Sequence, residues 1–494
     1  MEQKSNSYQQ IFKATSILGG VQVLNIIISI IRSKIVAVFL GPSGMGIVSI
    51  FTSTIGLLAQ ITNFGLGTSA VKNITIASEA NDHQKLAKTT SVFLKLVWIT
   101  GMFGFIVALA LSPYLSKIAF GSDKYTFAFV LLSVTLLFTQ VSAGQNVILQ
   151  GMRKIQYMAK SNTLGALLGL IISIPVYYFW REDGIVPAMI LSSISIMVIS
   201  FYYVKKIKIA NFPVNTYDFK TEGKDMLRMG LLISFSSIIT LAVAYIVRIY
   251  INKVGGIKDV GLFTAGFAII NTYVGMVFTA MSSDYYPRLA SVSEDNKKTK
   301  QIINEQAEIA ILILSPILIV FLVFIHWGIL LLYSIDFIEV IPMVHWATLG
   351  IFFKALTWSM GYLFLARGAS KVFFWNELCS NCYVLISNLL GYYYFGLTGL
   401  GVSFLISYFI YFIQVFFICK KYYEFDMNKA IIKIFSIQFS LALFSFVAVY
   451  YCNVFIAYSV GLLMVLLASW FSWNELDGRL NIKATIKNKF KKNG

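Results

Sequence analysis

Apolar residues are grouped into runs of about 20, separated by short polar connections, along almost the whole chain. A run of that length matches the hydrocarbon thickness of a bilayer, so each run predicts one membrane-spanning helix. Turn residues separate the runs, as in Gly41-Pro42-Ser43-Gly44 and Arg181-Glu182-Asp183-Gly184. The pattern predicts an all-α polytopic membrane protein with about 14 helices, at 14–40, 45–66, 89–112, 126–150, 160–180, 185–204, 229–252, 260–284, 303–327, 341–366, 372–394, 398–419, 430–449 and 454–473.

Composition agrees with this pattern, because 57% of residues are hydrophobic, 13% are charged and the mean hydropathy is +0.75. The net charge of +18 reflects membrane topology rather than nucleic-acid binding. With the N-terminus inside, cytoplasmic segments hold 30 of the 40 Lys and Arg residues and the outer segments hold 5. The positive-inside rule therefore predicts that both termini are cytoplasmic. The first apolar run follows a polar start and shows no cleavage site, so we expect no signal peptide.

The longest polar connection, 205–224, follows the sixth predicted helix and divides the chain into halves that resemble each other. Arg32, a glycine turn and Gly46-Ile-Val in the first half correspond to Arg248, Gly255-Gly256 and Gly261-Leu-Phe in the second, about 215 residues later. Six helices per half predict parallel pseudo-twofold repeats, a layout typical of alternating-access transporters. The predicted organisation is an N-terminal lobe at 1–204, a cytoplasmic linker at 205–228, a C-terminal lobe at 229–424, and an extra helical hairpin with a basic cytoplasmic tail at 425–494.

Five cations fall inside the predicted helices, where each must face the bundle interior or water. Arg32, Arg248 and Lys354 lie near the middle of the bilayer, judged by their distance from the nearest turn. Lys95 is close enough to the cytoplasmic end to extend into water. Lys34 is two residues from Arg32 and hence on another helix face, which favours Arg32 as the ligand contact. We expect Arg32, Arg248 and Lys354 to surround one central cavity.

Buried acids are too few to neutralise these cations. Glu377 is the deepest acid, and the sequence leaves open whether it carries a proton or forms a plain salt bridge. A cationic cavity favours an anionic ligand, and the fork of an arginine side chain binds two phosphate oxygens at once. Trp358 and Tyr362 follow Lys354 by one and two turns, where they can stack on sugar rings.

Other chemistry has little support in the sequence. Cys379 and Cys382 form a CxxC, but it lies in an apolar run, where ordinary packing explains it. The three histidines show no metal-ligand spacing, so we expect no metal and no cofactor. No P-loop, DxD motif or large outer loop indicates an integral-membrane enzyme.

Five short motifs, in order along roughly residues 12–420, resemble Wzx-type O-antigen translocases and lipid III flippases of the multidrug/oligosaccharidyl-lipid/polysaccharide (MOP) exporter superfamily. They are Lys34-Ile-Val-Ala-Val-Phe-Leu-Gly-Pro-Ser-Gly-Met-Gly46, Asp259-Val-Gly-Leu-Phe263, Tyr286-Pro-Arg-Leu289, Lys354 followed by Gly361-Tyr-Leu-Phe-Leu-Ala366, and Phe374-Trp-Asn-Glu-Leu378. Many members of that family carry an acid a few residues before this lysine, where the present chain has Gly350 and Ile351. That departure puts in doubt any coupling scheme that uses an acid there, and it adds weight to Glu377.

The resemblance implies a flippase of the bacterial inner membrane. It would move an undecaprenyl-pyrophosphate-linked oligosaccharide of the O-antigen type to the outer leaflet by alternating access, with ion coupling. The pyrophosphate would meet Arg32, Arg248, Lys354 and Lys34, and the partners would be a polymerase and glycosyltransferases of the same pathway. The alternatives are a multidrug efflux transporter of the same fold, whose cationic substrates need buried acids, and a lipid II-type flippase. The extra helical hairpin resembles the pattern of the lipid II flippases in the same superfamily.

Overall fold

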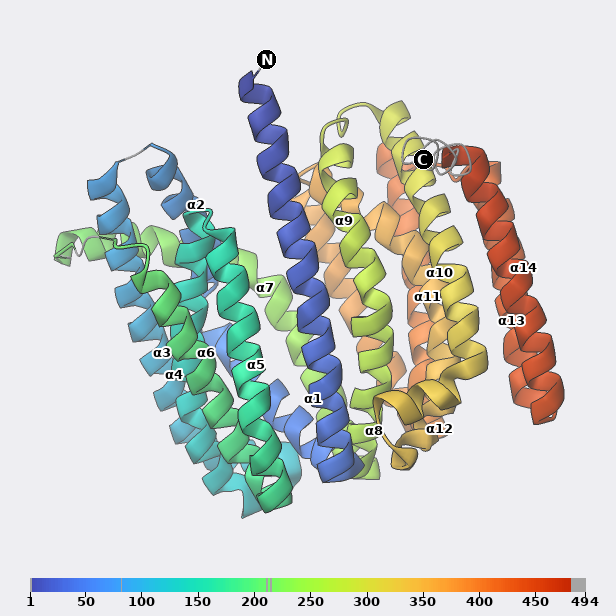
Figure 1. The fold of residues 1–494 in the computed structure, drawn as a ribbon, viewed down its shortest axis with the longest axis horizontal. Coiled ribbons are helices and arrows are strands. Elements are labelled where there is room, and N and C mark those ends of the chain that lie inside the picture. The colour runs from blue at the N-terminus through green and yellow to red at the C-terminus, as the bar shows by residue number, and fades with distance from the viewer. Residues whose placement is uncertain (1, 81, 210–211, 214–215, 481–494) are drawn as a thin grey trace, which may run out of the picture. The chain divides into compact units, whose positions relative to one another are not determined.

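The computed structural model describes residues 2–80, 82–209, 212–213 and 216–480, and this part of the chain is helical without β-strands (Figure 1). The α-helices are α1 (Glu2–Thr62), α2 (Leu66–Glu79), α3 (His83–Phe120), α4 (Thr126–Gly151), α5 (Ile155–Trp180), α6 (Ile185–Lys205), α7 (Thr216–Gly255), α8 (Ile257–Ala268), α9 (Gly275–Ala290), α10 (Asn296–Leu332), α11 (Ile341–Ala366), α12 (Ser370–Tyr423), α13 (Lys429–Tyr451) and α14 (Val454–Leu480). Short helices are η1 (Asp123–Tyr125), η2 (Arg181–Gly184), the π-helical turn η3 (Ile269–Val274) and η4 (Ile335–Val340).

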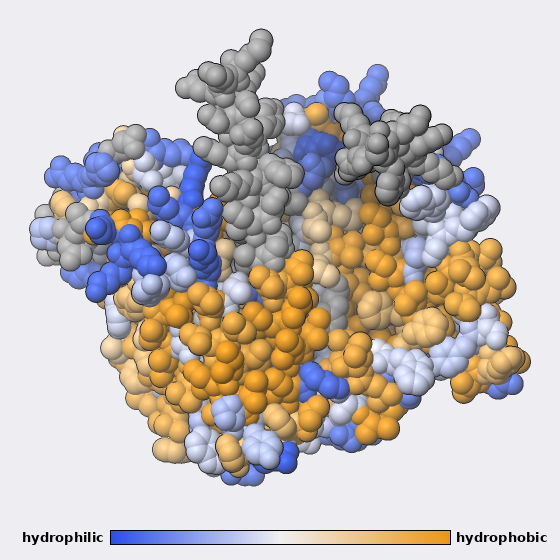
Figure 2. All heavy atoms as spheres, viewed as in Figure 1, coloured by the Kyte–Doolittle hydropathy of each residue, from blue (hydrophilic) through white to orange (hydrophobic). Residues whose placement is uncertain are grey.

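Eleven helical segments in the described residues are long and apolar enough to cross a membrane. Three of them contain a break: α1 at Gly41, α12 at Gly396, and the run from α5 through η2 to α6. Each is long enough for two passages, so the total of 14 crossings stays a prediction compatible with the structure. Figure 2 shows hydrophobic side chains covering the middle of the visible helices, with hydrophilic residues toward their ends. The predicted all-α, polytopic membrane fold is therefore confirmed.

The chain forms two compact units, Met1–Gly261 and Leu262–Gly494. In the first, α7 packs on α1, α2 and α3, although the sequence assigned it to the C-terminal lobe. In the second, α11 packs on α12, while α10 packs on both helices of the hairpin, α13 and α14. The predicted lobe boundaries stay a prediction. The basic tail at 481–494 and parts of the predicted linker lie outside the described residues.

Equivalent glycines of the two halves contact each other within the first unit. Gly41 and Gly256 both adopt a left-handed backbone, with φ of 65° and 92°, and each turns the chain before the next helix begins. A Cβ atom on Gly46 would collide with the carbonyl oxygen of Ile257, and one on Gly261 would collide with the carbonyl oxygen of Pro42. The two collisions are reciprocal, as a local twofold relation between repeats requires. Glycine is therefore needed at both positions.

A second pair of contacts repeats inside each unit. Ser173 and Ser192 join α5 to α6 through a 3.3 Å hydroxyl contact, and Ser387 and Ser407 join the two halves of α12 at 2.7 Å. The glycine that starts the following helix also packs on a backbone carbonyl in both units: Gly184 on that of Val176, and Gly399 on that of Gly391. The same serine and glycine contacts occur at equivalent positions of both units, and this supports the predicted parallel repeat.

Hydropathy alone misplaced several elements. The amphipathic α2 was not predicted because its 14 residues, with a polar exposed side, are too few to span a bilayer. Helices α3 and α10 begin earlier than predicted, at capping residues Asp82 and Asp295, because their first turns are polar. The π-helical turn η3 interrupts the helix that was predicted at 260–284.

Candidate functional site

Arg32 is placed on α1 opposite two helices of the first unit. Its Nη2 lies 3.2 Å from where a Cβ atom on Gly169 of α5 would stand, and Ser192 of α6 borders the same point. Tyr177 of α5 is itself buried. The Nε and Nη2 atoms of Arg32 are buried and have no hydrogen-bond partner among the residues that the structure describes. A charged group therefore lies among neutral neighbours with unused donors.

Arg248 lies on α7 and contacts the second half of α1. Its Nε donates to the hydroxyl of the buried Ser49 at 3.1 Å, and its Nη1 donates to the Ala244 carbonyl at 2.9 Å. Both acceptors are neutral, so these bonds orient the guanidinium without cancelling its charge. Lys34 is half-buried on α1, while Lys95 is exposed on α3 with its Nζ 5.3 Å from the centre of the Phe219 ring.

Lys354 lies on α11 in the second unit. Its Nζ donates to Asn271 Oδ1 at 3.1 Å, and Asn271 belongs to the π-helical turn η3. The Nζ also lies 5.4 Å from the centre of the Tyr408 ring and 5.9 and 5.8 Å from those of Phe278 and Phe404. Aromatic faces stabilise a cation through their quadrupole, again without supplying a negative charge. π-Helical turns of this kind occur frequently at functional sites.

Glu377 is half-buried on α12 in a network of neutral partners. Tyr411 donates its hydroxyl hydrogen to Glu377 Oε1 at 2.9 Å and accepts a bond from Asn376 Nδ2 at 3.0 Å. Gln414 Nε2 in turn donates to Asn376 Oδ1 at 2.7 Å. Among the described residues Glu377 forms no ion pair, so the plain salt bridge that the sequence left open is not formed here.

Two tyrosines connect the cation and the acid of the second unit. The rings of Tyr408 and Tyr411 lie 6.3 Å apart, with Tyr408 beside Lys354 and Tyr411 bonded to Glu377. The sequence predicted Lys354 and Glu377 but not the tyrosines or Asn271. Their role depends on which helices pack together, and aromatic residues occur throughout these helices.

Trp358 and Tyr362 are half-buried neighbours on α11, with ring centres 5.4 Å apart. Trp358 also packs on Phe278 at 5.3 Å, and Tyr362 on Tyr286 at 5.9 Å. Phe278 is one of the rings around Lys354, so the aromatic cluster extends from the lysine toward the end of α9. Contact with sugar rings stays a prediction for these residues.

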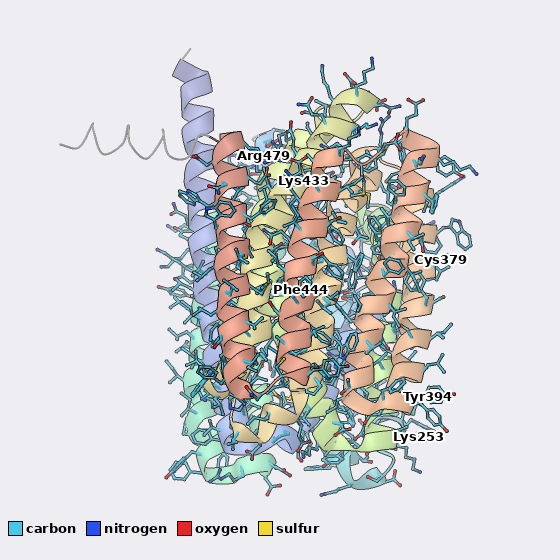
Figure 3. The ribbon with its side chains drawn as sticks, turned by 90° about the vertical axis from the view of Figure 1, so that its right-hand side faces the viewer. Lys253, Cys379, Tyr394, Lys433, Phe444 and Arg479 are labelled. Atoms are coloured by element: carbon cyan, nitrogen blue, oxygen red, sulfur yellow. The ribbon has the colours of Figure 1, made fainter. Side chains whose placement is uncertain are left out.

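The predicted cations thus fall in two places. Arg32, Lys34 and Arg248 belong to the first unit, and Lys354 belongs to the second with Glu377, Trp358 and Tyr362. One cavity shared by Arg32, Arg248 and Lys354 stays a prediction. Cys379 and Cys382 are free and exposed, and Figure 3 shows Cys379 directed outward from α12. Within the described residues, no three His, Cys, Asp or Glu side chains are grouped to hold a metal ion.

Comparison with solved structures identifies the fold. A structure titled as an inward-facing multidrug resistance MATE family transporter of the MOP superfamily superposes with a TM-score of 0.70 at 17% identity, over 83% of this chain and 96% of the other. The lipid II flippase MurJ, in an inward closed conformation, superposes with a TM-score of 0.67 at 14% identity, over 94% and 99%. The fold is that of the MOP exporter superfamily.

Sequence comparison then identifies the family. A family model described as polysaccharide biosynthesis protein matches residues 11–293, and the chain belongs to that family. It is similar to the lipid III flippase of Escherichia coli K12, with 23% identity over 352 residues, 70% of this chain and 82% of the relative. It is also similar to the stage V sporulation protein B of Bacillus subtilis 168, with 22% identity over 41% of each chain. The predicted superfamily, the location in the bacterial inner membrane and the role as a transporter rather than an enzyme are confirmed.

Proposed function

We propose that this protein is a flippase for an undecaprenyl-pyrophosphate-linked oligosaccharide, which it moves from the cytoplasmic to the outer leaflet. The observation that carries the proposal is the buried guanidinium of Arg32, with two nitrogen atoms that lack a partner among the described residues. A buried charge without a counter-ion is costly, and a bound anion removes that cost.

A pyrophosphate fits this environment. Two of its oxygen atoms can accept parallel hydrogen bonds from the N–H groups of one guanidinium. An arginine also stays protonated at every physiological pH. Gly169 and Ser192, which border the Nη2 atom, are both neutral. Lys354 is also held by a neutral group, the side chain of Asn271, so it retains its charge for an anion.

The remaining parts of the substrate have matching features. The aromatic cluster of Trp358 and Tyr362 offers ring faces to sugars, while the undecaprenyl chain stays in the bilayer. Transporters built from two repeats expose a midplane site to each face in turn, which moves the headgroup across without exposing it to lipid. Enzymes that build the repeat unit inside and polymerise it outside are the proposed partners. Similarity to a lipid III flippase supports this substrate class.

Glu377 is the proposed coupling group. Its Oε1 accepts a hydrogen bond from Tyr411, and it has no cationic partner among the described residues, so its charge can change without breaking an ion pair. An intramembrane acid with these properties is typical of proton relays and ion sites. Export of cationic drugs fits less well, because the arginines of the first unit would repel them.

The direct test is transport by purified protein in liposomes that contain a fluorescent undecaprenyl-pyrophosphate oligosaccharide. A reductant added outside destroys only the label in the outer leaflet, so the protected fraction reports transport. Wild-type protein should equilibrate the label, and Arg32→Gln should slow this at least tenfold. Arg153→Gln is the matched control, since Arg153 is exposed and paired with Glu79. Equal rates for wild type and Arg32→Gln, or no transport by wild type, would refute the proposal.

A further inference from the structure

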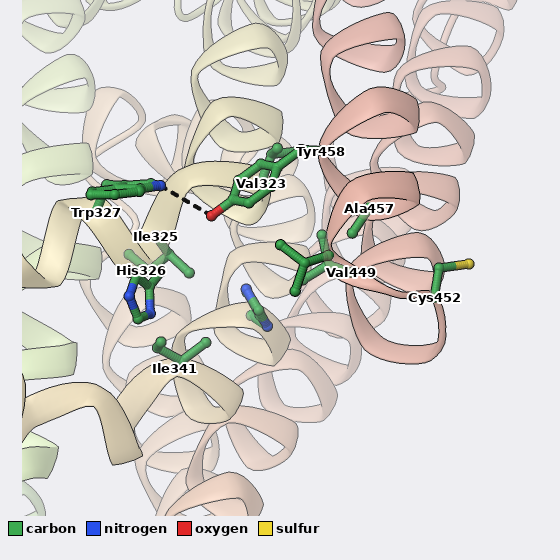
Figure 4. A pocket seen from close by; sticks show the side chains of 11 residues that line it. Val323, Ile325, His326, Trp327, Ile341, Val449, Cys452, Ala457 and Tyr458 are labelled. Atoms are coloured by element: carbon green, nitrogen blue, oxygen red, sulfur yellow. Dashed lines mark hydrogen bonds between the residues drawn. The ribbon is translucent and has the colours of Figure 1, made fainter.

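A pocket of about 380 Å³ lies at one end of the second unit, where the extra hairpin meets the rest of it (Figure 4). It is bordered by the last turns of α10, the first turns of α11, the end of α13 and the start of α14. Its volume is within the range of small-molecule sites. The predicted topology places this end at the outer face of the membrane. None of the features assigned to transport lies there.

The pocket wall is mainly apolar. Trp327 Nε1 donates to the hydroxyl of Tyr458 at 3.1 Å, which leaves the hydroxyl hydrogen of Tyr458 available as a donor (Figure 4). No Lys, Arg, Asp or Glu is among the eleven described residues that line it. These residues are Val323, Ile325, His326, Trp327, Ile341, His345, Val449, Cys452, Val454, Ala457 and Tyr458.

His345 supplies the feature that points to a ligand. The residue is only 4% exposed. Its Nε2 is buried and has no hydrogen-bond partner among the described residues. In a neutral imidazole one ring nitrogen donates and the other accepts a hydrogen bond, and a hydroxyl group can pair with either kind. The pocket wall therefore contains an unpartnered buried polar atom, and buried polar groups normally have partners.

We propose that this pocket binds an uncharged membrane lipid with a free hydroxyl group, of the diacylglycerol type. The hydroxyl would form a hydrogen bond with His345 Nε2, the acyl ester would accept from Tyr458, and one acyl chain would lie against the apolar wall. A phosphate-bearing headgroup fits less well, because no basic side chain among the lining residues would neutralise it. His345 is one turn from the start of α11, so the hydroxyl would sit near the membrane interface, where lipid esters lie.

The test uses full-length protein in nanodiscs with a diacylglycerol that carries a photoactivatable diazirine in one acyl chain. The control probe is the same lipid with its hydroxyl acetylated. Mass spectrometry of digested protein then locates the label. The expected result is labelling of α10 and the α13–α14 turn that is at least fivefold stronger with the hydroxyl probe. His345→Phe should remove that preference, and His83→Phe, at an exposed histidine elsewhere, should keep it.

A second variant keeps the test decisive if His345→Phe does not fold. Ala457→Trp adds bulk to the pocket wall without touching His345, and it should reduce labelling by both probes. Equal labelling by the two probes in wild-type protein, label located elsewhere, or a hydroxyl preference that survives both variants would overturn the proposal. Because the readout is binding, it is independent of whether the substrate proposed above is the transported one.

Discussion

Gly46 and Gly261 contact each other backbone to backbone, at equivalent positions of the two sequence repeats. Each lies five residues after a glycine with a left-handed backbone, and each leaves no room for a Cβ atom because of the carbonyl four residues before the other. The two motifs that revealed the repeat in the sequence are thus also the two surfaces that meet.

This contact predicts that a single methyl group is strongly destabilising at either position. Gly46→Ala and Gly261→Ala each force two backbones apart, and overpacking of this kind typically costs about 1–3 kcal/mol or more. The midpoint of thermal unfolding in detergent should fall clearly for both variants. Gly361→Ala on α11 is the matched control, since a Cβ atom there meets nothing within 4 Å. An unchanged midpoint for Gly46→Ala would contradict the close contact.

Much of the fold could be predicted because bilayer thickness imposes a length on each apolar run. The same logic identified Arg32, Arg248, Lys354 and Glu377, since a charged residue inside such a run is costly and usually functional. The hydrogen-bond partners of these residues were not predictable in this way. Tyr411 is 34 residues from Glu377, and only the packing of the two halves of α12 brings them together. Likewise, α2 has no membrane-length run, and the π-helical turn that presents Asn271 has no clear sequence signal.

Ser49 and Arg248 are hydrogen-bonded, and variants of the two residues distinguish a structural role of Arg248 from a role in transport. Ser49→Ala removes a neutral acceptor from a charged donor, which should cost about 1.5–3 kcal/mol of stability while the positive charge remains. Arg248→Gln removes the charge and should abolish transport in the liposome assay while the protein still inserts. Ser53→Ala, which removes a hydroxyl that bonds the Ile50 carbonyl in its own helix, is the control and should change neither property. Full transport by Arg248→Gln would exclude a role for its charge.

The Glu377 network predicts which gradient drives transport. Glu377→Gln keeps the shape of the side chain and an oxygen that accepts from Tyr411, but it can no longer gain or lose a proton. Transport in liposomes should then stop responding to an imposed pH gradient, whereas Tyr411→Phe should retain the response at a reduced rate. If the response to a sodium gradient is lost instead, Glu377 binds that ion. A variant with wild-type responses to both gradients would show that the acid is only structural.

The extra hairpin is fixed to α10 by an ion pair between Arg479, which is half-buried, and Glu308, which is buried. Arg479 Nε lies 2.8 Å from Glu308 Oε2, and Asn428 Nδ2 donates to the other carboxylate oxygen at 2.8 Å, so α14, the start of α13 and α10 meet at one carboxylate (Figure 3 labels Arg479). The Glu308 side chain is 8% exposed.

Removing one member of such a pair leaves an uncompensated buried charge, which typically costs about 3–5 kcal/mol. Arg479→Gln should therefore lower the unfolding midpoint more than the double variant Glu308→Gln/Arg479→Gln, in which no charge is left alone. Lys433→Gln, which removes an exposed partner of Glu475, is the control and should have little effect. If the single and double variants unfold at the same midpoint, the pair does not hold the hairpin in place.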